Sequence, residues 1–95
     1  MLRLPDKLML DDAPAVLAAL AQALRGGPAA ATVDASGLLR FDSAALAVLL
    51  ECRRLAQAAG QGFAVHGASP KLAALARLYG LDALLPLAAV PGDPH

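Results

Sequence analysis

Apolar residues recur along this chain at two spacings, one typical of helices and the other of short strands. A first helix is predicted between the Asp11–Asp12 pair, which can cap it, and the Gly26–Gly27 pair, which can end it. A second is predicted from Ser43 to Ala59. A third should begin at Ser69–Pro70, in the usual order of cap and then proline, and end before Gly80.

Short apolar runs between these helices predict strands. We expect one or two short edge strands within residues 2–10, a buried strand over 29–35 and another over 63–66, with 36–40 as a loop. A further helical turn is expected at 82–85. Strands separated by helices pair in parallel through right-handed crossovers. The sequence therefore predicts a small α/β fold, a sheet of about four mostly parallel strands with three to four helices packed on it.

The second predicted helix carries two stripes on a helical wheel. The first is a continuous apolar arc that should face the sheet, formed by Ala45, Val48, Leu49, Cys52, Leu55, Ala56 and Ala59. The second lies more than a quarter-turn away and consists of Ser43, Leu46, Leu50, Arg53, Arg54 and Gln57. Its two leucines are either buried against the third helix or part of a surface that binds another protein.

Asp42 and Ser43 stand at the start of this helix. Either side-chain oxygen can accept a hydrogen bond from the free N–H groups of the first turn, which stabilises a helix by about 1 kcal/mol. Capping explains the residue types but not the leucines that follow Ser43 on the same stripe. A docking surface explains both, and a phosphate on Ser43 would lie at the positive end of the helix dipole and disturb an apolar partner.

Composition and charge exclude several classes of function. The 95 residues suit one domain, which we place at 1–88 with 89–95 as a flexible C-terminal tail. Eight basic and eight acidic residues give no net charge, and aromatic residues make up only 3% of the chain, so we expect no nucleic-acid partner. Cys52 is the only cysteine, and His66 has no serine and aspartate in the order of a catalytic triad. We therefore expect no enzyme, no cofactor and no bound metal.

The distribution of charges also bears on location. Acidic residues near the N-terminus are unlike a signal peptide, and no apolar run reaches the ~20 residues that a membrane span needs. The sequence predicts a cytoplasmic protein without direct membrane insertion.

Residues 33–50, VDASGLLRFDSAALAVLL, resemble the signature of STAS domains, the fold of anti-sigma factor antagonists. That signature is a strand ending in Asp, a short loop, an Asp-Ser or Asp-Thr pair, a small residue and a leucine-rich helix. Residues 63–85, FAVHGASPKLAALARLYGLDALL, are similar to the family's second half. Within the family, the compact size and the segment 75–86, LARLYGLDALLP, are most like the MlaB type.

The resemblance implies a non-catalytic subunit of a phospholipid-transport ABC transporter. Such a subunit binds the cytoplasmic ATPase subunit and is held beside the inner membrane through that complex. The alternative is an anti-sigma factor antagonist that a kinase, the anti-sigma factor, switches off by phosphorylating Ser43. Either role uses the same partner-binding surface, which the resemblance and the stripe assign to Leu39, Arg40, Asp42, Ser43, Leu46, Leu50 and Arg54.

Two features depart from the family pattern. Ala45 stands where a glycine is usual, and its methyl group disfavours phosphorylation more than it disfavours binding. The hairpin expected before the first helix is compressed into about ten residues, so one of its strands should be missing or very short.

Overall fold

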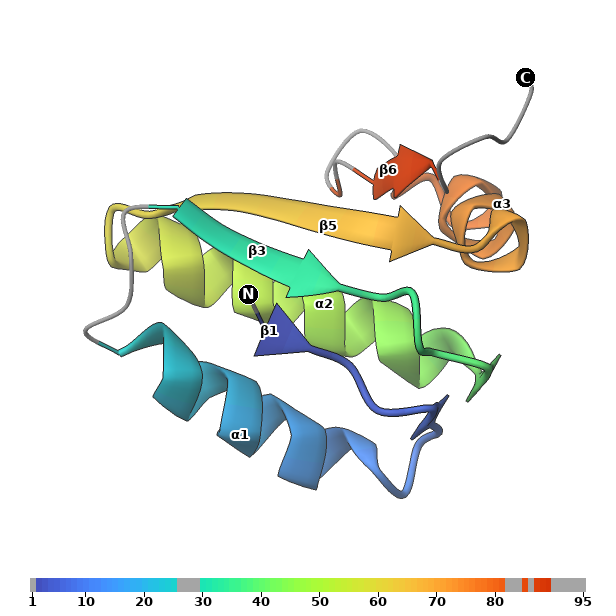
Figure 1. Ribbon diagram of the computed structural model, residues 1–95, viewed down its shortest axis with the longest axis horizontal. Coiled ribbons are helices and arrows are strands. Elements are labelled where there is room, and N and C mark those ends of the chain that lie inside the picture. Colours follow the sequence, from blue (N-terminus) through green and yellow to red (C-terminus); the bar gives the residue numbers. More distant parts are fainter. Residues whose placement is uncertain (1, 26–29, 82–84, 86, 90–95) are drawn as a thin grey trace.

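The computed structural model describes residues 2–25, 30–81, 85 and 87–89. Strands and helices alternate along it (Figure 1), in the order β1 (Leu2–Arg3), β2 (Lys7–Leu8), α1 (Ala13–Leu24), β3 (Ala30–Asp34), β4 (Arg40–Phe41), α2 (Ser43–Ala58), β5 (Gly62–Ala68), α3 (Pro70–Leu78) and β6 (Leu87–Ala89). This is the α/β alternation that the apolar pattern predicts.

The strands form two parallel sheets. The main sheet has four strands in the order β1-β3-β5-β6, and the small one pairs β2 with β4. In the main sheet Val33 lies opposite Leu2 on one side and Val65 on the other. The two N-terminal strands are each two residues long and join different sheets. They therefore do not form the hairpin expected from the family pattern.

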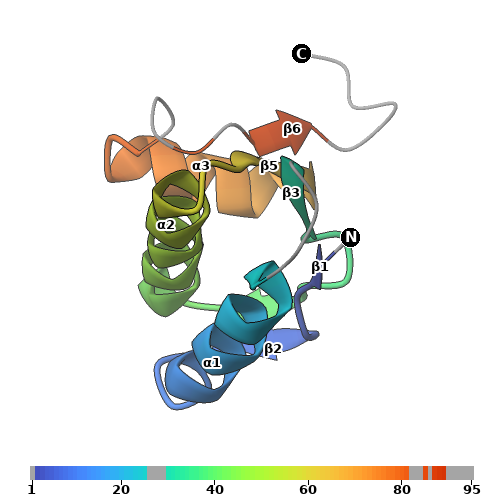
Figure 2. The same cartoon turned by 90° about the vertical axis from the view of Figure 1, so that its left-hand side faces the viewer.

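The helices bury their apolar faces to form one core. Figure 2 shows α1 and α2 on one side of the main sheet, while α3 lies near the end of β5 (Figure 1). The largest fully buried side chains come from both sheets and from α2 and α3, and they include Leu8, Val33, Leu46, Leu49, Cys52, Val65 and Leu72. Burial, and to a lesser degree the nearby Glu51, raises the pKa of the Cys52 thiol to about 11.

The core arc predicted for α2 is largely confirmed. Five of its seven residues are buried, namely Ala45, Val48, Leu49, Cys52 and Ala56. Leu55 is half-buried and packs against the core. Ala59 is exposed, because the helix ends at Ala58 and Ala59 is its C-cap.

Three strands differ from the prediction. β5 covers Gly62–Ala68 rather than 63–66, and it includes Gly67 at φ +72°, where a Cβ would lie 2.8 Å from the Cβ of Ser36. β4 begins at the last residue of the predicted loop 36–40, and β6 lies outside every predicted strand. β6 ends at Ala89, the first residue assigned to the tail.

The helix ends follow their sequence signals with one exception. Ser69 caps α3 by accepting a hydrogen bond from the Leu72 N–H at 3.1 Å, as predicted. Asp12 occupies the N-cap position of α1 but makes no side-chain cap bond. Its carboxylate instead accepts from the Met9 N–H at 2.9 Å and pairs with Lys7, and these two contacts, in that order, lower its pKa.

Three expectations lie outside the described residues. These are the Gly26–Gly27 end of α1, most of the helical turn at 82–85, and the tail from residue 90 onward. Leu85, which is described, is buried, and its N–H donates to the Leu81 carbonyl at 2.9 Å.

Candidate functional site

Asp42 joins two parts of the chain at the start of α2. One carboxylate oxygen, Oδ1, accepts a hydrogen bond from the Ala44 N–H at 2.8 Å and so caps the helix. The other, Oδ2, accepts from the Leu10 N–H at 3.2 Å, thirty-two positions earlier in the sequence. Of the two residues that could cap α2, Asp42 is therefore the one that does, and both of its oxygens are occupied by backbone donors.

Ser43 has a different environment although it is the next residue. It is exposed, and within the described residues its hydroxyl makes no hydrogen bond. Capping thus accounts for Asp42 and leaves the Ser43 hydroxyl open to solvent and to any molecule that approaches this end of α2.

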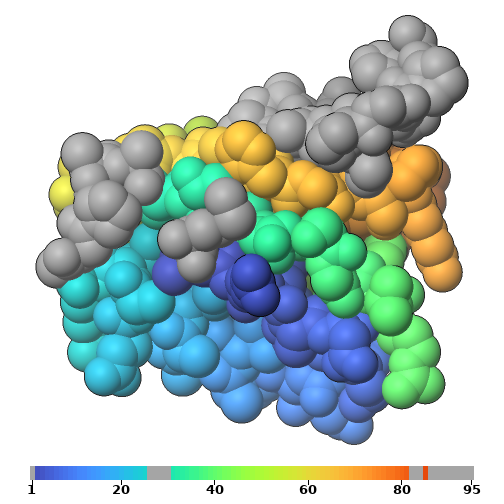
Figure 3. Space-filling model, in the orientation of Figure 1, coloured from blue at the N-terminus to red at the C-terminus, as the bar shows by residue number. Residues whose placement is uncertain are grey.

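Two adjoining hollows meet at Ser43. The first has a volume of about 520 Å³ and is lined by Phe41, Asp42, Ser43, Lys71, Ala74, Leu75, Leu78 and Tyr79. The second has a volume of about 300 Å³ and is lined by Ser43, Leu46, Ala47, Leu50, Tyr79 and Leu81. Because Ser43 and Tyr79 line both, the two hollows adjoin, and we call them together the α2–α3 groove. Figure 3 shows the chain near residue 40 (green) and α3 (orange) at the same end of the molecule.

The large apolar side chains that are exposed, among the described residues, are concentrated near this groove. They are Leu10 and Leu39, each 72% exposed, Leu78 at 77% and Tyr79 at 55%. Leu78 and Tyr79 line the groove itself. Leu10 is tied to Asp42 by its N–H, and Leu39 directly precedes β4. Such a concentration of exposed apolar surface is typical of a site that another molecule covers.

Four of the seven residues of the predicted partner surface line the groove, and three do not. Ser43, Asp42, Leu46 and Leu50 line the groove. Leu46, however, is only 2% exposed and belongs to the core, so of the two alternatives for the leucines of this stripe, burial holds for Leu46. Leu50 is half-buried and packs against the core with one side.

The remaining three residues of that predicted surface lie outside the groove. Leu39 and Arg40 are exposed but line neither hollow. Arg54 is exposed and donates from Nε to Glu51 Oε1 at 2.7 Å, so its charge is already paired on the surface of α2.

Sequence reasoning missed the contribution of α3. In the sequence, Leu72, Leu75, Leu78 and Tyr79 supply the apolar positions of the third predicted helix, but of α3 only Leu72 and Ala76 are buried. The signal was present, because the groove residues Lys71, Ala74, Leu75 and Leu78 follow the spacing of one helix face, next to the face of Leu72 and Ala76.

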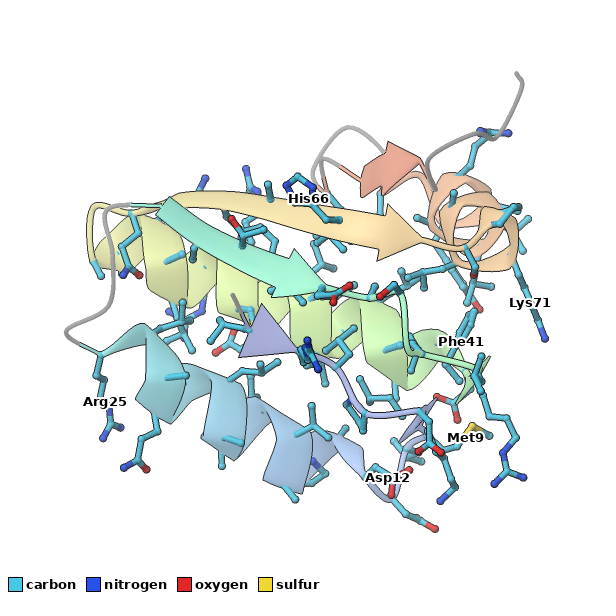
Figure 4. All side chains as sticks on the ribbon, viewed as in Figure 1. Met9, Asp12, Arg25, Phe41, His66 and Lys71 are labelled. Carbon is cyan, nitrogen blue, oxygen red and sulfur yellow. The ribbon has the colours of Figure 1, made fainter. Side chains whose placement is uncertain are left out.

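Lys71 is the cationic side chain of the groove. Its Nζ lies 5.6 Å from the centroid of the Phe41 ring, within the range of a cation–π contact. Within the described part of the chain, no carboxylate lies at ion-pair distance from it. Figure 4 shows Lys71 and Phe41 at this end of the molecule, with His66 farther back along β5.

Asp34, the aspartate that ends β3, lies on the surface away from the α2–α3 groove. Its carboxylate interacts with the side chain of Ser36 and accepts from the Ser36 N–H at 2.9 Å, and these two interactions lower its pKa. His66 lies beside it on β5 and is exposed. These residues do not line the groove.

Comparisons with known proteins address the fold. A family model described as "Mlab, STAS domain" matches residues 1–86. A solved structure, described as an anti-sigma-factor antagonist (STAS) domain protein from Planctomyces limnophilus, superposes with a TM-score of 0.73 at 18% sequence identity, covering 90% of this chain and 75% of that one. No curated protein matches the chain. Among the described residues, no helix is both long and apolar enough to cross a membrane.

Proposed function

The chain belongs to the STAS domain family, and we propose that it is a non-catalytic, protein-binding subunit of a phospholipid-transport ABC transporter. In this role it binds the cytoplasmic ATPase subunit, supports the assembly and activity of that subunit, and stays beside the inner membrane through the complex. The α2–α3 groove is the binding surface. The name of the matching family model, which is of the Mlab type, favours this role within the family.

One observation carries the proposal of a protein-binding surface. The groove is open, is lined mainly by apolar side chains, and has the exposed Leu78 and Tyr79 at its edge. Exposed apolar side chains gain free energy when a partner removes them from water, at about 25 cal/mol per Å² of apolar area. The polar side chains common to both hollows are Ser43 and Tyr79, and the first hollow adds Asp42 and Lys71.

The test is to purify tagged protein from its native cells and identify the proteins that come with it by mass spectrometry. We expect an ABC ATPase in the eluate, and we expect Leu78→Asp to remove it, because the charge would be buried in an apolar interface. Ala23→Asp is the matched control, since Ala23 is also exposed on a helix but lies on α1, away from the groove. An eluate without an ATPase, or equal recovery with both variants, contradicts the proposal.

A second function is favoured by the Ser43 hydroxyl. Because this hydroxyl is exposed and makes no hydrogen bond within the described residues, a kinase could reach it. In that case the protein is an anti-sigma factor antagonist whose partner is an anti-sigma factor kinase, and phosphorylation of Ser43 releases the partner. Ser43→Asp should then lose a partner that Ser43→Ala retains, and phosphate should be found on Ser43. Equal binding by the two variants would rule out the switch.

A further inference from the structure

The walls of the α2–α3 groove restrict the kind of chain that can occupy it. They are formed mostly by side chains of α2 and α3, whose backbone N–H and C=O groups are largely engaged within the helices. An extended peptide would bring its own backbone groups into an apolar groove that offers few partners for them, at a cost in free energy. A helix satisfies its backbone internally and presents only side chains, so it fits this groove better.

The dimensions of the groove agree with a helix of about two to three turns. On α3 its lining runs from Lys71 to Leu78, and on α2 it runs from Ser43 to Leu50. Each stretch has eight residues, and its ends are about 10.5 Å apart at a rise of 1.5 Å per residue. Apolar residues at positions i, i+3 or i+4, and i+7 of a partner helix span the same distance and can enter the two hollows.

The charges at the groove indicate the sign of the partner's polar side chain. Asp42 also lines the first hollow, but both of its carboxylate oxygens already accept hydrogen bonds from backbone N–H groups, those of Leu10 and Ala44. Lys71 is exposed, is held near the Phe41 ring, and has no carboxylate within ion-pair distance among the described residues. An ammonium group beside an apolar groove is complemented by an acidic side chain on the edge of the incoming helix.

We propose that the α2–α3 groove binds an amphipathic helix of the ATPase subunit that places apolar side chains in the two hollows and an Asp or Glu against Lys71. This rests on the proposed function, which supplies the partner. It adds the secondary structure of the segment that binds, the spacing of its apolar residues and the sign of its charge.

The first experiment locates the partner segment. The photoreactive residue p-benzoylphenylalanine is incorporated at Ala74, which lines the first hollow, or at Ala47, which lines the second; both are exposed. After irradiation of the native complex, mass spectrometry identifies the cross-linked peptides. We expect both positions to reach one ATPase segment with apolar residues three or four positions apart and at least one Asp or Glu. The same probe at Ala23 on α1 should give no such product.

The second experiment tests the charge. Lys71→Glu should weaken binding of the purified partner roughly tenfold, because an attraction at the rim of the interface becomes a repulsion. Arg77→Glu is the matched control, since Arg77 is exposed on the same helix but does not line the groove. Glutamate is favourable in the first turn of a helix, so Lys71→Glu should not unfold α3. Replacing the cross-linked acidic residue of the partner by Lys should restore binding to Lys71→Glu.

The outcomes separate this inference from the proposed function. If the ATPase is captured but the cross-linked segment is extended or lacks an acidic residue, the inference is wrong and the proposed function stands. Equal effects of Lys71→Glu and Arg77→Glu likewise overturn the inference alone. If a different protein is captured through an acidic amphipathic helix, the proposed function fails while the assignment of the groove holds. Cross-links to a second copy of this chain, or to lipid and no protein, overturn both.

Discussion

The carboxylate of Asp42 provides a direct test of how the groove end of α2 is held in place. Asp42→Ala removes two acceptors at once, the cap on the Ala44 N–H and the bond from the Leu10 N–H. Loss of an N-cap costs about 1 kcal/mol. The second bond is exposed, and its loss adds about 0.5 kcal/mol, at the low end for a hydrogen bond. The free energy of unfolding should therefore fall by about 1.5 kcal/mol, which lowers the Tm of a domain this size by roughly 6–12 °C.

Two further variants make this expectation specific to Asp42. Asp42→Asn keeps one carbonyl oxygen and should lose less stability than Asp42→Ala. Ser43→Ala should change the free energy of unfolding by less than about 0.5 kcal/mol, because the Ser43 hydroxyl is exposed and makes no hydrogen bond within the described residues. Urea titrations followed by circular dichroism give all three values if the m-value is unchanged. A loss at Ser43→Ala as large as that at Asp42→Ala would refute the division of roles between these neighbours.

Three other predictions test the packing of the fold. Leu46→Ala should lower the free energy of unfolding by about 2–5 kcal/mol, as for other buried leucines. Leu50→Ala should lower it by clearly less, because Leu50 is half-buried. Equal losses in urea titrations would contradict the assignment of Leu46 to the core. Between pH 9 and 11 the thiol of Cys52 ionises in the unfolded chain but stays protonated in the folded one, because burial raises its pKa from 9.0 to about 11. Stability should therefore fall with rising pH by up to about 1.4 kcal/mol per unit, and a Cys52→Ala variant followed over the same range should lack this part of the slope. In thermal melts, Gly67→Ala should destabilise the protein by more than about 1 kcal/mol, since the residue has φ +72° and an added Cβ would clash. Gly37→Ala should have little effect, because nothing lies within 4 Å of the position of its Cβ.

The sequence predicts the parts of the fold whose signals are local. The cap and proline at Ser69–Pro70 fix the start of α3, and Asp42 with the leucines after it fixes the start of α2. Their physical causes, a free N–H to satisfy and an apolar face to bury, act within a few residues. The parallel order of the strands follows from the helices between them.

Features that depend on distant contacts could not be predicted in this way. β2 and β4 are two residues each, too short to show alternation, and they are defined only by their pairing with each other, thirty-three positions apart in the sequence. Leu46 lies on the outer stripe of the helical wheel, yet it is buried, because the wheel gives directions but not which neighbour covers them. The exposure of Leu78 and Tyr79 could not be predicted for the same reason, because it depends on which neighbours α3 packs against.

The two candidate functions make competing demands on a single hollow of the groove. Ser43 and Lys71 both line the first hollow, in which Asp42 is already held by two backbone donors. A phosphate on Ser43 would add one to two negative charges there, and Lys71 is the cationic side chain in the same lining. Phosphorylation would then oppose an acidic partner helix in two ways, by repelling its carboxylate and by engaging Lys71. If the carboxylate of the partner depends on Lys71, Ser43→Asp should accordingly release less of the partner in a Lys71→Gln background than in the wild-type background. If only the apolar contacts matter, the release should be the same in both.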